Sequence, residues 1–366
     1  MTWSEEENRR LAGAVQEALA TLHRLASSLE RGDVHYAVHD EFLDRVLSLE
    51  RYLATAIAAV NAGNHAPGFA LLRSALEHHL VDHLLMRGRR RIRRGRKISQ
   101  ETFDRWWASW KGGEEGYEHI VDMQRNDKGS VRIVDEAIRV NDEHGVHEYS
   151  LSIYYAYFNE FDPLVGPPSE QEHLDHPWLE VDEQREIARE QRRLYEAAMR
   201  WKSIRDHLEV NEFYSVDELL QLNVHYRFLS AFVHPTPTGD KILQWHHSSY
   251  VPIYERDREH IAWELGHLYA AALATREIHV FLEMASDRPR VSIRDHDAIV
   301  RAARIAREQS ARLWFVGDDP HPYDLEMRRL RASRRRCKGS DDDGVLRYYP
   351  NPYDRLAGLH RSRWQQ

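Results

Sequence analysis

The chain has 366 residues, of which 42% are hydrophobic and 30% are charged. This composition excludes wholesale disorder and allows one large helical body or two domains. Its only cysteine, Cys337, excludes an intramolecular disulfide and a thiolate metal cage, so a reducing compartment is expected. The charged N-terminal stretch is unlike a secretion signal, and no uncharged apolar run reaches the roughly 18 residues that span a bilayer. We therefore expect a cytoplasmic protein without membrane contact.

The formal net charge of −8 conceals two strongly basic segments. Residues 87–97 hold seven Arg and one Lys, and residues 328–338 hold six Arg and one Lys, with no acid in either. The rest of the chain has 36 basic and 59 acidic residues, a net charge of about −23. Because Arg pairs bidentately with phosphate, the segments either bind nucleic acid or are solvated stretches that balance an acidic body. The candidate contacts in the first segment are Arg89, Arg90, Arg91, Arg93 and Arg94.

Apolar residues recur every three or four positions along most of the chain, as on the buried face of a helix. In chain order, this spacing predicts helices over residues 5–30, 40–62, 67–86, 180–209, 215–233, 255–285 and 293–314. Between them, residues 99–160 are expected to form two or three shorter helices rich in aromatic residues. The proline-rich stretch 161–179 is expected to be a long irregular connection.

The predicted fold class is therefore all-α, a helical bundle with an aromatic-rich helical insertion and a basic C-terminal tail. We expect no internal repeat and no Gly-rich phosphate loop. The four expected segments are bundle helices with the Arg-rich cluster (1–98), the insertion with its proline-rich loop (99–179), the C-terminal bundle helices (180–315) and a loosely ordered tail (316–366).

The helix expected over residues 215–233 carries the clearest candidate site, a polar stripe on an otherwise apolar helix. Four polar residues fall within about 60° of one another at the helical repeat: Asn223, Arg227, Ser230 and His234. The opposite side is apolar or aromatic, so most of this helix should be buried. The stripe then needs partners, because an unpaired buried polar group costs roughly 1–3 kcal/mol.

An earlier helix offers a matching pair in the run LLRSALE. Arg73 and Glu77 are four residues apart and share one face of that helix. Either Glu77 holds Arg227 in place, or Arg73 binds phosphate while Glu77 orients it. The alternative is a purely structural salt-bridge network that ties two core helices together.

The segment YRFLSAFVHP places six residues between Arg227 and His234. This spacing is similar to the R-x(4–6)-H signature of the HEPN superfamily, helical domains found in nucleotide-binding and RNA-cleaving proteins. The pairing of LLRSALE with YRFLSAFVHP also resembles a group of uncharacterised bacterial helical proteins related to that superfamily. The resemblance covers residues 35–90 and 180–285, about half the chain. One departure is Phe228, at a position where HEPN proteins usually have a polar residue.

The resemblance implies an up-down helical core and a metal-independent endoribonuclease without a cofactor, acting as a toxin or in phage defence. RNA would be the substrate, and two chains would form a homodimer with Arg and His of both facing one groove. A regulatory protein partner is compatible with such an effector.

The candidate catalytic residues suit RNA cleavage by the 2′-OH of the substrate. His234 suits proton transfer, because an unperturbed imidazole has a pKa near 6.5. Arg227, with Arg73 as a helper, suits stabilisation of charge on the phosphate oxygens, and Ser230 and Asn223 suit hydrogen bonds to phosphate or ribose. The alternative function is a non-catalytic helical module that binds nucleic acid or a partner protein.

Two histidine patterns point less specifically to a metal enzyme, a third class of function. His79 and His83 lie four apart on a helix, a spacing that can bind zinc, although such histidines are more often packed or exposed. Glu264 and His267 form one Glu-x-x-His motif, of which a di-iron bundle needs two. None of the other expected bundle helices carries a second copy, so we predict no metal ligand.

Overall fold

The computed structural model divides the described part of the chain into two compact units, Met1–Asp82 with Val216–Gln366, and His83–Ser215. The residues whose structure is described are 5–31, 36–88, 90–93, 117–125, 132–142, 145–150, 182, 185, 189, 199–233, 255–286, 291–316, 351–353, 355–357 and 359.

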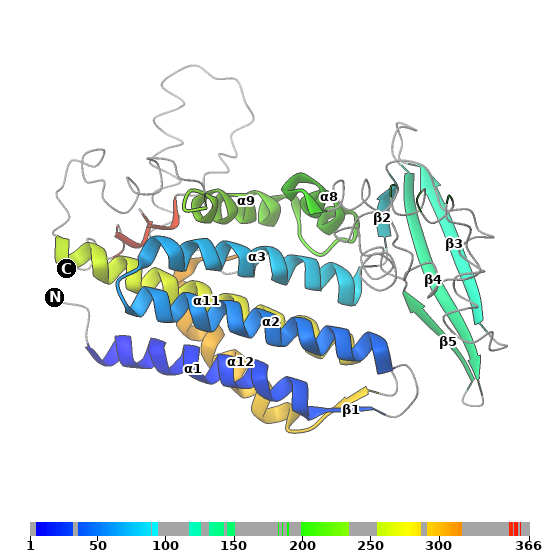
Figure 1. Cartoon of the computed structure of the whole chain (residues 1–366), viewed down its shortest axis with the longest axis horizontal. Helices are drawn as coiled ribbons and strands as arrows, with labels where there is room; N and C mark the ends of the chain where they lie inside the picture. The colour runs from blue at the N-terminus through cyan, green and yellow to red at the C-terminus, as the bar shows by residue number, and fades with distance from the viewer. Residues whose placement is uncertain are drawn as a thin grey trace, which may run out of the picture. The chain divides into compact units, whose positions relative to one another are not determined.

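The first unit is a helical bundle, which confirms the predicted bundle (Figure 1). Its long helices run side by side: α1 (Glu5–Ser28), α2 (Tyr36–Asn61), α3 (His65–Arg87), α11 (Glu255–Ser286) and α12 (His296–Ser310). The shorter α9 (Val216–Ser230) also belongs to this unit, whereas the last residues of α3, from His83, belong to the other. A short ribbon of β1 (Leu29–Arg31) and β6 (Val291–Ile293) pairs antiparallel, and a 3-10 turn η1 (Ala311–Leu313) follows α12.

The core of the bundle follows the predicted periodicity. On α1, the apolar positions at spacings of three and four are buried, as shown by Leu11, Val15, Ala18, Leu22 and Leu25. Helix α11 contacts α1, α2 and α12, and its residues 264–275 are all buried. A helix surrounded on most sides forms the centre of a bundle, so α11 is the element around which the others are arranged.

Helices α2, α3 and α11 approach one another closely where Val60 meets two glycines. A Cβ atom on Gly68 would lie 2.6 Å from Val60 Cγ2, and one on Gly266 would lie 2.9 Å from the same carbon. Neither distance is compatible with a side chain unless the helices shift. The two glycines therefore permit this contact between the three helices.

The second unit contains an antiparallel sheet, which the sequence analysis did not predict. Its central strand is β4 (Arg132–Asp142), which pairs with β2 (Arg90–Arg93), β3 (Tyr117–Arg125) and β5 (Gly145–Ser150). In the longest pairing, Tyr117 lies opposite Val140 and Arg125 opposite Arg132. The expectation of helices over 99–160 is therefore wrong for the described part of that segment, where β-branched residues favour strands.

The compact units do not coincide with the four expected segments. Helix α8 (Trp201–Val210) belongs with the sheet, although the prediction grouped 180–315 with the bundle. Asn211, which ends α8, bonds the backbone of Arg90 in β2 through both its side-chain oxygen (2.8 Å) and nitrogen (2.6 Å). The second unit is thus a sheet with its own helix, not an extension of the bundle.

The tail predicted to be loosely ordered is packed in its described part. Tyr353, Leu356 and Leu359 are buried in the first unit. Buried Arg355 donates a hydrogen bond to the carbonyl oxygen of Arg312, and its guanidinium carbon lies 5.6 Å from the centroid of the Trp314 ring. Apolar and cation–π contacts together explain why these residues are held on the bundle.

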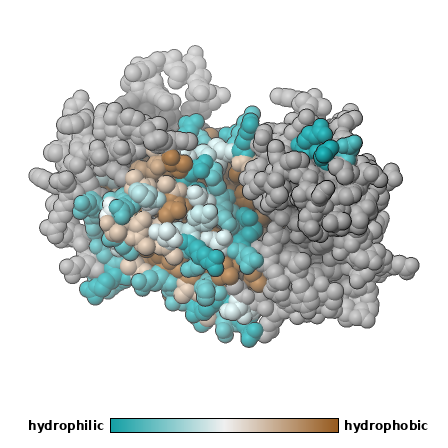
Figure 2. Space-filling model, viewed as in Figure 1, coloured by the Kyte–Doolittle hydropathy of each residue, from teal (hydrophilic) through white to brown (hydrophobic). Residues whose placement is uncertain are grey.

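The described surface carries its apolar residues singly on several helices. Figure 2 shows hydrophilic and hydrophobic residues interspersed on one face. The exposed large hydrophobic side chains lie on α2, α9 and α12 and directly after α9: Tyr52, Val216, Leu220, Val233, Val300 and Ile305. Among the described residues, no helix combines the length and apolar character that crossing a membrane requires. The predicted homodimer stays a prediction.

Candidate functional site

Three polar side chains meet between α3 and α9, and we call Arg73, Glu77 and Tyr226 the α3–α9 cluster. Arg73 Nη2 donates hydrogen bonds to Glu77 Oε1 and to the Tyr226 hydroxyl, each over 2.8 Å. The Arg73 guanidinium carbon also lies 5.2 Å from the centroid of the Tyr226 ring. The side chains of Arg73 and Glu77 are 21% and 26% exposed, so solvent reaches both.

Aromatic packing holds α9 against α3 and α11 beside this cluster. The ring of Phe69 on α3 lies 5.6 Å from that of Phe228 in an edge contact and 5.0 Å from that of Phe232. Phe228 also stacks on Tyr269 of α11, with 6.2 Å between ring centroids. Because Phe228 follows Tyr226 by two residues, this packing fixes the rotation of α9 that directs Tyr226 to Arg73.

The environment of Glu77 changes its protonation. Burial raises its pKa above the ordinary value, and this effect exceeds the opposing influence of the Arg73 charge and the Tyr226 hydrogen bond. A carboxyl group with a raised pKa exchanges a proton nearer to neutral pH than an ordinary glutamate does. Half-buried groups of this kind are candidates for proton transfer.

The residues of the predicted polar stripe that the structure describes differ in exposure and in their contacts. Arg227 is exposed, and no described side chain pairs with its guanidinium. The prediction that Glu77 holds Arg227 is therefore wrong. Glu77 instead pairs with Arg73, and phosphate binding by Arg73 stays a prediction. Asn223 and Ser230 are half-buried. His234 lies outside the described residues, so its role stays a prediction.

Two buried polar atoms near the cluster have no hydrogen-bond partner among the described residues, Arg73 Nε and Ser230 Oγ. Ser230 lies one helical turn after Tyr226, on the same side of α9. A buried donor or acceptor without a partner is uncommon in a folded protein and calls for an explanation such as a ligand or a water molecule. Both atoms therefore suit contact with a bound polar group.

Tyr226 is the member of the cluster that the sequence analysis missed, because it was assigned to the apolar side of its helix. A tyrosine carries a hydroxyl on an apolar body and can belong to either side. Its position three residues after Asn223 and four before Ser230 places it next to the polar stripe. That spacing is the only sequence signal that points to it.

Of the basic segment, the structure describes two side chains, those of Arg87 and Arg90, and the guanidinium carbon of Arg87 lies 5.8 Å from the centroid of the Phe213 ring. Arg90 pairs with residues that follow α8 or end it. Its Nη1 donates hydrogen bonds to Glu212 Oε1 over 2.8 Å and to the Val210 carbonyl oxygen over 3.4 Å. Arg91 and Arg93 lie on β2, and their side chains, like Arg89 and Arg94 as a whole, lie outside the described residues. The exposed Glu212 pairs with Arg90 and so neutralises part of the positive charge of this segment. Its binding of nucleic acid stays a prediction.

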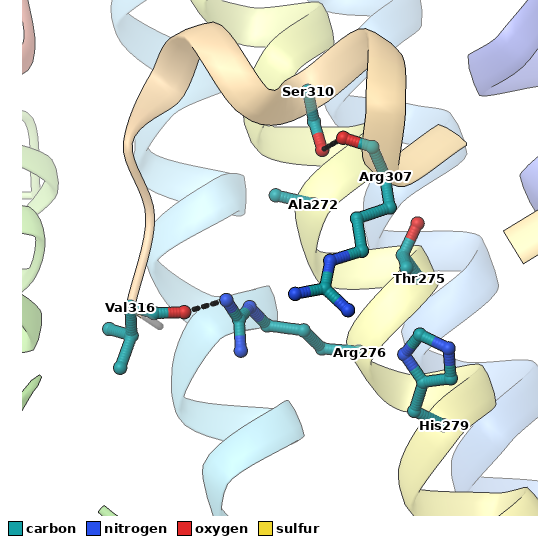
Figure 3. Close-up of a pocket in the computed structure, with 7 residues that line it drawn as sticks. All are labelled: Ala272, Thr275, Arg276, His279, Arg307, Ser310 and Val316. Atoms are coloured by element: carbon teal, nitrogen blue, oxygen red, sulfur yellow. Dashed lines mark hydrogen bonds between the residues drawn. The ribbon is translucent and has the colours of Figure 1, made fainter. Parts of the chain in front are cut away.

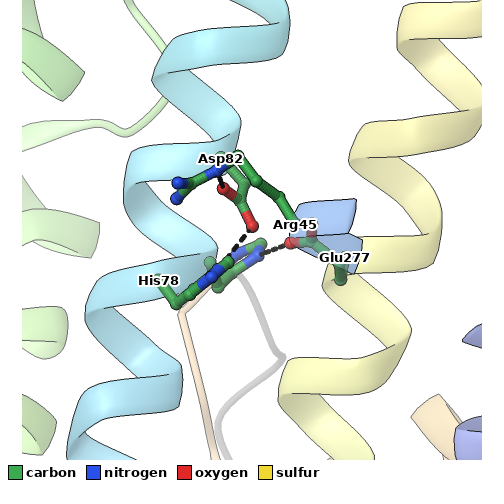
Figure 4. Close-up of polar contacts among 5 residues, drawn as sticks. Arg45, His78, Asp82 and Glu277 are labelled. Carbon is green, nitrogen blue, oxygen red and sulfur yellow. Dashed lines mark hydrogen bonds and ion pairs between the residues drawn. The ribbon is translucent and has the colours of Figure 1, made fainter. Parts of the chain in front are cut away.

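A second polar cluster lies inside the bundle, and we call Arg45, His78, His79, Asp82 and Glu277 the core ion cluster (Figure 4). Asp82 accepts hydrogen bonds from Arg45 Nε and, over 2.7 Å, from His78 Nδ1. His79 Nδ1 lies 2.8 Å from Glu277 Oε2. Asp82, His79 and Glu277 are all fully buried.

The protonation states within the core ion cluster follow from burial and charge. Burial alone would raise the pKa of Asp82, but Arg45 and His78 lower it to about 2. Burial and the neighbouring Asp82 raise the pKa of Glu277 well above its ordinary value, and burial and Arg276 lower that of His79 to about 3. Asp82 is therefore charged, whereas Glu277 and His79 are neutral. Because three of its members are fully buried, we interpret the cluster as structural.

The residues of the two histidine patterns considered for metal binding make packing, hydrogen-bond and ion-pair contacts within the chain. His83 stacks on Phe213, with 4.1 Å between ring centroids, and is thus separate from the His79–Glu277 contact. Glu264 pairs with Arg312 over 3.4 Å, and His267 donates to the Trp263 carbonyl oxygen over 2.8 Å. Among the residues with described side chains, no three His, Cys, Asp or Glu groups come together as a metal site requires.

Comparison with known proteins adds no relative. No family model, curated protein or solved structure matches this chain. The resemblance to the HEPN superfamily stays a prediction, and the candidate function depends on the geometry of the α3–α9 cluster.

Proposed function

We propose that the chain is a HEPN-like endoribonuclease that needs no metal and binds an RNA phosphate at the α3–α9 cluster. The observation that carries the proposal is the state of Arg73, which Glu77 and Tyr226 hold in place while its side chain stays 21% exposed. An oriented guanidinium that solvent reaches suits a phosphate oxygen.

Arg227 supplies a second positive charge next to Tyr226 in the sequence. It is exposed, and among the described residues no carboxylate neutralises it. Arg73 would hold the phosphate at the cluster, and Arg227 would attract the RNA backbone and stabilise the charge that grows on the phosphate oxygens. The hydroxyl of Ser230 and the amide of Asn223 offer hydrogen bonds to phosphate or ribose.

The reaction needs two proton transfers. The 2′-oxygen of the RNA attacks the phosphorus and loses its proton, while the bond to the 5′-oxygen breaks and that oxygen gains a proton. The products are a 2′,3′-cyclic phosphate and a 5′-hydroxyl. His234 is the proposed carrier of one proton, and Glu77, with its raised pKa, is the proposed carrier of the other.

A cleavage assay with matched variants tests this function. Purified protein is incubated with end-labelled RNA in EDTA, and the products are analysed for 2′,3′-cyclic phosphate ends. We expect His234→Ala and Glu77→Gln each to slow cleavage by about 10²-fold or more, and Arg227→Ala to slow it as well. Arg51→Ala, which removes an exposed arginine of α2, is the control and should cleave like the wild type.

The proposal fails if the wild type cleaves no RNA, or if the double variant Arg227→Ala/His234→Ala cleaves as fast as the wild type. RNA binding without cleavage would favour a non-catalytic binding module, for which the Arg73–Glu77 ion pair provides a structural reason. For a role as a toxin or defence protein, expression should arrest cell growth, and His234→Ala should remove the arrest. Sedimentation of the purified chain tests the proposed homodimer.

A further inference from the structure

A pocket of about 180 Å³ lies between α11, α12 and the segment that follows η1, and we call it the α11–α12 pocket (Figure 3). Five polar residues line it: Thr275, Arg276 and His279 from α11, and Arg307 and Ser310 from α12. Two small apolar residues complete the lining, and none of the lining residues is acidic. The pocket therefore combines two positive charges, on the half-buried Arg276 and the exposed Arg307, with an imidazole and two hydroxyls.

The two arginines converge on the same space. Figure 3 shows the Arg307 side chain extending from α12 toward that of Arg276, whose guanidinium points at the Val316 carbonyl oxygen. Like charges repel at such positions, and an anion between them would convert the repulsion into two charge-assisted hydrogen bonds. No described side chain forms an ion pair with Arg307.

Arg276 is held in place before any ligand binds. It donates a hydrogen bond to the Val316 carbonyl oxygen, and its guanidinium carbon lies 4.8 Å from the centroid of the Phe315 ring. These contacts hold one edge and one face of the guanidinium in place at the pocket. A group fixed in this way loses little conformational entropy when it binds.

The remaining lining residues suit a tetrahedral anion. Burial, with Arg307 and Arg276, lowers the pKa of His279, while Glu283 opposes them. A neutral imidazole can still donate one N–H to an oxygen. The hydroxyls of Thr275 and Ser310 now face the carbonyl oxygens of Ala303 (3.4 Å) and Arg307 (3.1 Å), and hydroxyl rotors can reorient.

We propose that the α11–α12 pocket binds a phosphate group, either inorganic phosphate or the phosphate end of a nucleotide. Its volume equals that of about six waters at roughly 30 Å³ each in the liquid, which fits a phosphate but not a nucleic-acid strand. The site uses α11 and α12, whereas the proposed RNA site uses α3 and α9, so either can exist without the other.

Titration calorimetry of the full chain tests the pocket, with inorganic phosphate and a nucleoside monophosphate as separate probes. We expect saturable 1:1 binding of inorganic phosphate, a higher melting temperature in its presence, and an affinity at least about tenfold lower in Arg307→Ala, the loss of one charge-assisted contact. The matched control is Arg304→Ala on the same helix, whose exposed side chain pairs with Glu308 at 3.9 Å and should be without effect.

The two probes separate the sources of the phosphate. Tighter binding of the nucleoside monophosphate, lost in Arg307→Ala, assigns the pocket to a nucleotide, while equal affinities assign it to inorganic phosphate. Non-saturable binding, equal affinity in Arg307→Ala, or equal binding of the unphosphorylated nucleoside would overturn the proposal. The test compares Arg307→Ala with Arg304→Ala, both on α12, so failure of the ribonuclease proposal does not affect it.

Discussion

Removing one partner of the ion pair between Arg45 and the buried Asp82 should destabilise the bundle. Arg45→Met removes the guanidinium but keeps a long apolar side chain. It leaves the fully buried Asp82 carboxylate with His78 as its hydrogen-bonding partner in this cluster. Removing one partner of a buried pair typically lowers the free energy of unfolding by about 3–5 kcal/mol, because the remaining charge is no longer compensated.

The pKa of Asp82 gives a second way to obtain the stabilisation that its pairing contributes. Burial opposes ionisation, yet Arg45 and His78 lower the pKa of Asp82 from 3.8 to about 2. At about 1.4 kcal/mol per pKa unit, the charged form stabilises the folded chain by roughly 2–3 kcal/mol. Because the folded pKa is the lower one, this stability is present above about pH 4 and is lost as the pH falls toward 2.

Urea unfolding followed by circular dichroism measures both effects, at pH 7 and through the acid range. The control is Arg304→Met, which breaks the exposed pair with Glu308 and should cost about 0–1 kcal/mol. The double variant Arg45→Met/Asp82→Asn should recover most of the loss, because no buried charge remains. If Arg45→Met costs no more than Arg304→Met, the argument for a charged, paired Asp82 is refuted.

Three further predictions concern the bundle. In urea unfolding, Gly13→Ala should stabilise the chain by about 0.5–1 kcal/mol, because a Cβ there meets open space. Gly68→Ala should destabilise it by about 1–3 kcal/mol through the clash with Val60. Equal effects of the two variants on the free energy of unfolding would contradict the close packing at Gly68. Burial lowers the pKa of His225 to about 3. As the pH falls from 6.5, the contribution of His225 to the free energy of unfolding should therefore decrease by about 1.4 kcal/mol per pH unit. An imidazole of His225 that titrates near pH 6.5 by NMR would disprove this. Glu277→Gln should raise the melting temperature at pH 7.5 more than at pH 4.5. The pKa of Glu277 is raised in the folded chain, so its stabilisation is present at low pH and is lost as the pH rises. A variant that is less stable at both pH values would contradict a protonated Glu277.

The helices and one half of the candidate site could be predicted because they depend on local spacing. Residues three and four apart share a face in any helix, so the apolar positions of α1 and the Arg73–Glu77 pair follow from the sequence alone. The partner on α9 depends on how that helix is rotated in the bundle. This rotation is set by Phe69 and the aromatic residues that contact it, and it brings Tyr226 rather than Arg227 to Arg73.

The sheet could not be predicted from local spacing. In β4, apolar residues at 133, 134, 137 and 138 recur at helical intervals, although β-branched residues also suit a strand. What decides between the two is pairing with distant segments, such as β2, where Arg90 lies opposite Asp135. A helix forms its backbone hydrogen bonds within itself, whereas this strand depends on partners that are remote in the sequence.

Helix α3 shows why the type of residue alone does not identify a functional site. It carries a carboxylate at Glu77 and another at Asp82, each beside an arginine in the folded chain. Asp82 is sealed, and its charged partners lower its pKa, so its proton is lost throughout the physiological range. Glu77 is 26% exposed, and burial outweighs its partners and raises its pKa. A proton carrier must both exchange a proton and be accessible, and of these two carboxyl groups Glu77 is the one with a raised pKa and a partly exposed side chain.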